Sequence, residues 1–122
     1  MQSMANPRHR LAETEEIQIE TQRSAASPTH RTTIWVVVLG DDIYVRSVRG
    51  KAGRWYKEIT ANPSGVIHLE GQRIPVHAAP VAESKLIEQV SKEYLRKYQG
   101  WEYAPSMTRA EVLDTTLRLD PA

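Results

Sequence analysis

Alternating apolar and polar residues along the chain predict a series of short β-strands. The clearest is segment 16–22, where Ile17 and Ile19 alternate with polar neighbours in the two-residue period of a half-buried strand. Residues 32–39 are rich in β-branched side chains and include three consecutive valines, which indicates a central strand buried on both faces. The same criteria predict four further strands, at 43–48, 66–69, 73–81 and 112–119.

One long segment has the period of an α-helix. Residues 83–99 place apolar side chains on one stripe from Leu86 to Tyr98, and Gly100 supplies a C-terminal stop. A shorter helix is predicted at 53–59. Two i,i+4 ion pairs in the favourable order are expected on the long helix: Glu88 with Lys92, and Glu93 with Lys97.

Short turns between consecutive strands require antiparallel pairing. Six strands with one long helical connection favour a small closed barrel over an open sheet, because closure removes exposed edges. We therefore predict a mainly β fold: a six-stranded antiparallel β-barrel with two helices. Pro75 and Pro80 place strand 73–81 at an edge or at a bulge, since proline cannot donate to the ladder. Residues 1–14 are expected to form a flexible N-terminal arm or a short helical turn, and residues 15–122 the barrel domain.

Composition narrows the class of protein. A chain of 122 residues fits one domain. With 16 Lys and Arg against 15 Asp and Glu, it lacks the basic excess of a general nucleic-acid binder. Cysteine is absent, which excludes disulfides and thiolate chemistry. The longest apolar run, 34–39, is far shorter than the ~20 residues of a membrane span, and no signal peptide is evident, so we expect a cytoplasmic protein without membrane or nucleic-acid partners.

The segment 44–57 carries the strongest functional signal. A predicted strand runs into a loop with two glycines, and the loop opens a short helix. Glycine lets the backbone approach a ligand, and a helix N-terminus attracts anions. We predict that this loop holds the phosphate of a cofactor; the alternative is a solvated turn decorated with charges. The segment contains no carboxylate before Glu58 and five cations: Arg46, Arg49, Lys51, Arg54 and Lys57.

Tryptophans and histidines add weaker signals. Core packing is the favoured role for Trp35 and Trp55, whereas Trp101 follows a glycine and is a candidate for a pocket or a dimer contact. His68 and His77 fall in neighbouring strands that could bring them face to face, but no third ligand is evident nearby. We therefore predict no metal site, and structural roles for both histidines, with proton transfer by His77 left open.

Several runs together resemble the split β-barrel flavin-binding superfamily, which includes pyridoxamine-phosphate-oxidase-like proteins and deazaflavin-dependent nitroreductases. The resemblance rests on four runs: Arg31-Thr32-Thr33-Ile34-Trp35-Val36-Val37-Val38, Ile43-Tyr44-Val45-Arg46-Ser47, Trp55-Tyr56-Lys57-Glu58-Ile59-Thr60-Ala61-Asn62-Pro63 and Ile74-Pro75-Val76. It covers residues 16–120, and the tail 112–119 is similar to that of a small uncharacterised branch. One departure is that residues 24–31, ahead of the central strand, hold no glycine.

The resemblance implies a homodimer with FMN or a deazaflavin in a groove between the barrel and its partner. By the same resemblance, the strand from Thr33 to Val36 would present backbone groups to the cofactor ring. The cofactor-binding residues carried over are Arg31, Thr33, Arg46, Ser47, Lys51, Gly53, Arg54 and Trp55. The four basic residues among them would bind the phosphate.

The predicted function is that of a flavin- or deazaflavin-dependent oxidoreductase of unnamed substrate. No catalytic residue is assigned, because such cofactors carry the hydride chemistry themselves. A second hypothesis is a non-enzymatic small barrel that binds a phosphorylated metabolite or a protein partner in the same groove. A third is a nucleic-acid-binding barrel that uses the basic loop with Tyr44 and Trp55, against which the near-zero net charge argues.

Overall fold

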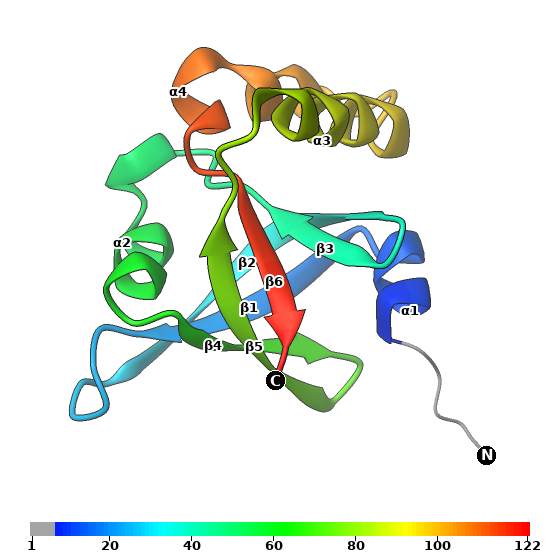
Figure 1. Ribbon diagram of the computed structural model, residues 1–122. Helices are drawn as coiled ribbons and strands as arrows, with labels where there is room; N and C mark the ends of the chain where they lie inside the picture. The colour runs from blue at the N-terminus through cyan, green and yellow to red at the C-terminus, as the bar shows by residue number, and fades with distance from the viewer. Residues whose placement is uncertain (1–6) are drawn as a thin grey trace.

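The computed structural model describes residues 7–122, and residues 1–6 lie outside the described part of the chain. Six antiparallel strands close into a barrel in the order β1-β2-β3-β6-β5-β4 (Figure 1). The predicted mainly β fold and its six-stranded antiparallel barrel are confirmed. The strands are β1 Glu16–Gln22, β2 Thr29–Leu39, β3 Asp42–Val45, β4 Ser64–Leu69, β5 Gln72–Pro80 and β6 Leu117–Pro121. The helices are α1 Pro7–Glu13, α2 Arg54–Ala61, α3 Ser84–Lys97 and α4 Ala110–Leu113, with short 3-10 turns η1 Gly50–Ala52 and η2 Ala104–Thr108.

Two apolar layers hold the molecule together. Inward-facing residues of the strands, such as Ile19 and Leu119, fill the barrel together with Trp55 and Ile59 of α2. A second layer lies outside the barrel, where the stripe of α3 packs on β2 and β3 (Figure 1). Neighbouring residues of β2 belong to different layers: Val36 faces the barrel interior and Val37 faces α3, and both are fully buried. This confirms the prediction of a central strand buried on both faces.

The last predicted strand, 112–119, was too long. Residues 110–113 form α4, and β6 begins only at Leu117. The hydroxyl groups of Thr115 and Thr116 donate to the carbonyls of Val112 and Leu113, three residues earlier. Such local side-chain bonds favour a turn over a strand. Alternation alone could not reveal the break, because Val112 and Leu117 are buried in either arrangement.

The predicted strand 43–48 also ends early, at Val45. The backbone N–H of Ser47 donates to Thr115 Oγ1 at 2.9 Å instead of to a neighbouring strand. The side chain of Arg46 turns into the protein at the same point. The chain therefore leaves the sheet where the candidate site begins.

The prediction of an edge or a bulge at β5 was wrong. The strand pairs with β4 along residues 72–77 and with β6 along 76–80, in continuous register. Pro75 fits because its carbonyl, which accepts the N–H of Ala122 at 2.9 Å, points to the β6 side. The backbone N–H that proline lacks would point the same way, so no bond to β4 is lost.

Within the predicted N-terminal arm, residues 7–13 form the helical alternative, α1, which docks through the fully buried Leu11. Of the two predicted ion pairs, Glu88–Lys92 is present at 3.8 Å. Glu93 pairs with Arg96, not with Lys97 as predicted. Lys97 Nζ instead donates to the carbonyls of Leu11 and Val36, at 3.0 and 2.5 Å, and so joins α1 to β2. No helix within residues 7–122 is long and apolar enough to cross a membrane.

Candidate functional site

A cavity of about 700 Å³ opens over β2, between the segment that follows β3 and the start of α2. Thr32 to Trp35 supply its wall along β2, and Tyr103 and Met107 line it from the region of η2. Its volume suits a small-molecule ligand. Six of the eight residues predicted to bind a cofactor line this cavity: Thr33, Arg46, Ser47, Gly53, Arg54 and Trp55.

One end of the cavity is built from the turn between β3 and α2. Gly50 adopts a positive φ of 67°, and its N–H donates to the carbonyl of Ser47 at 2.9 Å. The turn brings Gly53 to the N-cap position of α2, where no side chain caps the helix. The first N–H groups of a helix have no partner within it and carry partial positive charge.

Ser47 is the most unusual residue at this end. Its side chain is 1% exposed, and its Oγ has no hydrogen-bond partner within the described part of the chain. A Cβ on Gly53 would lie 2.5 Å from that oxygen, so the glycine is required for this close approach. A buried hydroxyl without a partner is rare and calls for an explanation, such as a ligand.

Two cations of the loop remain available at the cavity. Arg49 and Arg54 both line it and are exposed. Neither forms a salt bridge within residues 7–122. Together with the α2 N-terminus they make this end strongly attractive to an anion.

Arg46 lines the cavity as predicted, but its guanidinium is bonded inside the protein. It is 1% exposed, and its guanidinium donates to Thr116 Oγ1, Ser91 Oγ and the carbonyls of Met107 and Ile87, at 2.8–2.9 Å. Burial lowers the pKa of Arg46 below its usual value. With four hydrogen bonds inside the protein, Arg46 joins β3 to α3 and η2 beneath the cavity, and this leaves its guanidinium little capacity to hold a phosphate.

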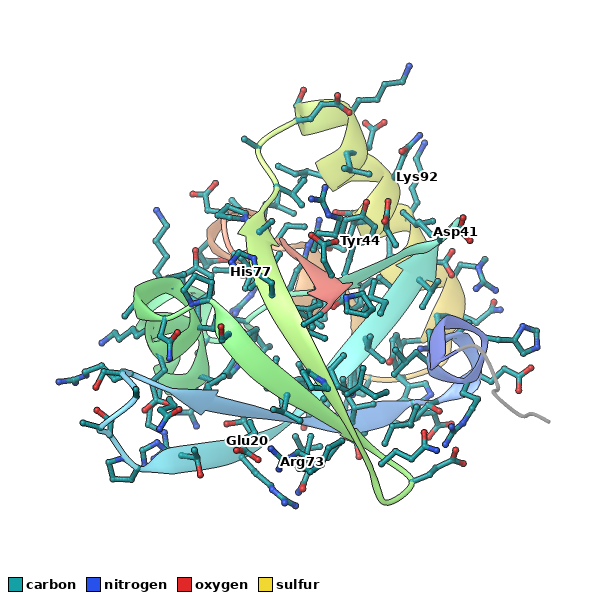
Figure 2. All side chains as sticks on the ribbon, turned by 60° about the horizontal axis from the view of Figure 1, so that its bottom comes forward. Glu20, Asp41, Tyr44, Arg73, His77 and Lys92 are labelled. Atoms are coloured by element: carbon teal, nitrogen blue, oxygen red, sulfur yellow. The ribbon has the colours of Figure 1, made fainter. Side chains whose placement is uncertain are left out.

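Two of the eight predicted residues, Arg31 and Lys51, do not line the cavity. Arg31 points toward Glu20, with Nε 3.9 Å from Oε1. His68 and Arg73 also contact that carboxylate, at 2.7 and 3.3 Å. Figure 2 shows Glu20 and Arg73 near each other. The hydrogen bond from His68 is the main reason why the pKa of Glu20 lies below its usual value. Lys51 is exposed on η1, outside the residues that line the cavity.

The other wall of the cavity is aromatic. Trp35 stacks on Tyr98 with ring centroids 4.1 Å apart, and Trp101 meets it edge-on at 5.4 Å. Trp35 is half-buried: it packs against the apolar layer between α3 and the barrel, as predicted, and it also lines the cavity. Trp55 is 5% exposed and does belong to the core.

Sequence reasoning missed Glu16 and Tyr103 as members of the site, and it named Arg49 only as one of the cations of the basic loop. Arg49 lay within the basic loop but could not be told apart from Arg46. Glu16 and Tyr103 stand in no motif, and only the fold brings them to the cavity.

The two histidines do not face each other as they could have done. Pairing of β4 with β5 sets His68 opposite Arg73 and His77 opposite Ser64. Within residues 7–122, no group of three or more His, Asp or Glu side chains could hold a metal ion.

Comparisons with known proteins agree on the fold. The family model described as "Uncharacterized protein conserved in bacteria (DUF2255)" matches residues 9–119. No curated protein matches the chain. The heme storage protein HutZ from Vibrio cholerae has a similar structure, with a TM-score of 0.73 at 16% identity over 100% of this chain and 92% of that one.

Two further solved structures resemble the chain. An F420-H2 dependent reductase gives a TM-score of 0.67 at 16% identity, covering 86% of this chain and 93% of its own. A candidate pyridoxamine 5′-phosphate oxidase from Listeria innocua gives 0.63 at 14% identity, covering 91% and 86%. These similarities confirm the predicted resemblance to the split-barrel superfamily, and identities this low concern the fold alone.

Proposed function

We propose that this chain, which belongs to the bacterial family DUF2255, binds a phosphorylated flavin-type cofactor in the cavity over β2 and serves as an oxidoreductase. The cofactor would be FMN or a deazaflavin. The similar structures named for an F420-H2 dependent reductase and for a pyridoxamine 5′-phosphate oxidase support this class of cofactor.

The observation that carries the proposal is the unpartnered Ser47 Oγ at the start of α2. A phosphate at this end of the cavity would accept a hydrogen bond from that hydroxyl and from the first N–H groups of the helix. Arg49 and Arg54 would neutralise its charge. Charge-assisted hydrogen bonds of this kind are about twice as strong as neutral ones.

The rest of the cavity suits a planar ring. Thr33 to Trp35 run along β2 beneath the space, and Trp35 and Tyr103 give it aromatic surfaces.

In this proposal the protein binds and orients, and the bound cofactor supplies hydride transfer. The basic end fixes the cofactor through its phosphate, and β2 sets the height of the ring above the barrel. The exposed Val48 and Tyr103, 47% and 69% accessible, lie at the cavity and support the predicted homodimer, in which a second copy would cover them.

The test is a titration of the purified protein with FMN and with a deazaflavin, followed by fluorescence. We expect saturable binding of one of them, weakened about 10-fold or more by Arg54→Ala, because a charged hydrogen bond is worth about 1.5–3 kcal/mol. Lys51→Ala is the matched control, since it removes a cation from the same turn without touching the cavity.

Equal losses in the two variants would mean that general charge, not the built site, attracts the ligand. Absence of binding of both cofactors would refute the proposal. Binding of other phosphorylated molecules under those conditions would favour the alternative, a non-enzymatic barrel for a phosphorylated metabolite.

A further inference from the structure

The cavity has two flanks of opposite charge. In the barrel β2 lies between β1 and β3. The basic segment 46–49 continues from β3, so the cations lie on that side of β2. On the other side, β1 contributes the carboxylate of Glu16 to the lining.

Glu16 is held at this position by the sheet. It pairs directly with Trp35 in the β1–β2 ladder, and directly opposed residues project from the same face. Its neighbour Ile17 is 3% exposed and belongs to the barrel core, so Glu16 faces outward, over the cavity. No cation lies within salt-bridge distance of its carboxylate in the described part of the chain.

Aromatic side chains share the cavity with this carboxylate. Trp35 lines the cavity, with Trp101 edge-on to it, and Tyr103 borders the same space. Tyr98 covers one face of the Trp35 ring by stacking, so the cavity lies against the remaining surface of the indole. A carboxylate beside aromatic faces is the combination that recognises ammonium groups, through charge and cation–π attraction.

We propose that the β1 flank is a subsite for an organic cation, a small molecule that bears an ammonium group and serves as substrate. This inference rests on the proposed function, since the cofactor would fill the basic flank and leave the acidic flank to the second ligand. A bound phosphate would neutralise Arg49 and Arg54. The guanidinium of Arg46 is buried beneath the cavity, so Glu16 would be the charge that a ligand meets on the β1 flank. Anionic substrates would be repelled by it.

The experiment uses choline and its uncharged isostere 3,3-dimethylbutan-1-ol, which have nearly the same shape. Each is titrated into the full chain while the intrinsic fluorescence of its three tryptophans, Trp35, Trp55 and Trp101, is recorded. We expect choline to bind at least about 5-fold more tightly than the isostere, and Glu16→Gln to abolish most of that preference. Glu88→Gln, which removes the same charge from the exposed face of α3, should keep it.

Equal affinity of choline and its isostere for the wild-type protein would overturn the inference, as would failure of choline to bind saturably. A preference that survives in Glu16→Gln would also overturn it, because the carboxylate would then not be the recognising group. Arg54→Ala separates the two proposals, since it should weaken FMN binding and leave the choline preference unchanged. If FMN fails to bind while the preference holds, only the cofactor assignment fails.

Discussion

Replacing Ser47 with alanine should change stability and affinity in opposite directions. The Ser47 hydroxyl is 1% exposed and unpartnered within residues 7–122, and burial of such a group costs about 1–3 kcal/mol. Removing it from the ligand-free protein should therefore raise the free energy of unfolding by about 1 kcal/mol. For a domain of this size that corresponds to a melting temperature about 3–5 °C higher.

The same change should weaken cofactor binding, because the hydroxyl would donate to a charged phosphate. Such a bond contributes about 1.5–3 kcal/mol, which is about 10- to 150-fold in the dissociation constant. Thermal unfolding followed by circular dichroism gives the first quantity, and the FMN titration gives the second.

Thr115→Ala is the matched control. Thr115 is also fully buried, but its hydroxyl accepts the N–H of Ser47 at 2.9 Å and donates to the carbonyl of Val112 at 2.6 Å. Its removal leaves the buried N–H of Ser47 without a hydrogen-bond partner, although the carbonyl of Val112 keeps the backbone N–H of Thr115 at 2.9 Å. The change should therefore lower the melting temperature. If Ser47→Ala also lowers the melting temperature, or leaves the affinity for FMN unchanged, then the Ser47 hydroxyl does not bind the phosphate of a ligand, and the prediction is refuted.

Two further predictions concern buried cations. Burial lowers the pKa of Lys97 from 10.5 to about 8, so between pH 8 and pH 10.5 the unfolded chain holds more protons and the free energy of unfolding rises with pH. In urea denaturation, the free energy of unfolding of Lys97→Met should rise by about 1–2 kcal/mol less than that of the wild type, given the partial exposure of the ammonium. Identical pH profiles of the two proteins would contradict this prediction. In the same assay, Arg46→Lys should lower the free energy of unfolding by at least about 3 kcal/mol, because one ammonium cannot donate to four acceptors. The control is the exposed Arg49: Arg49→Lys should change that free energy by no more than about 0.5 kcal/mol. A stable Arg46→Lys variant would show that the buried bonds are dispensable.

Most of the barrel could be predicted from periodicity, because each strand buries one face and its side chains alternate. Strand ends were harder to place. β3 ends at Val45 and β6 begins at Leu117 because the next residues form other hydrogen bonds. Arg46 donates to Thr116 and Ser47 donates to Thr115, each about 70 residues away in the chain. Local sequence patterns do not indicate hydrogen-bond partners that lie so far away in the chain.

The candidate site was predicted in outline for a similar reason. Glycines and cations in one loop indicate an anion, and Ser47, Gly53 and Arg54 do meet at the cavity. Which arginine turns inward depends on acceptors supplied by α3 and η2, so composition could not separate Arg46 from Arg49. Trp35 was predicted to pack in the core because the middle of β2 is buried. Its side chain stacks on Tyr98, where α3 ends, so one part of the ring is left to line the cavity.

The position of β6 has a consequence for the order of folding. Its residues pair with β3 across more than 70 intervening residues, as in the pair Ile43–Leu119. Contacts so distant in sequence form late and slow the folding rate. Because Thr115 and Thr116, which support Ser47 and Arg46, directly precede β6, the cavity is complete only after this strand has docked. Intermediates without β6 should therefore not bind the ligand, and ligand added during refolding should leave the folding rate unchanged while slowing unfolding.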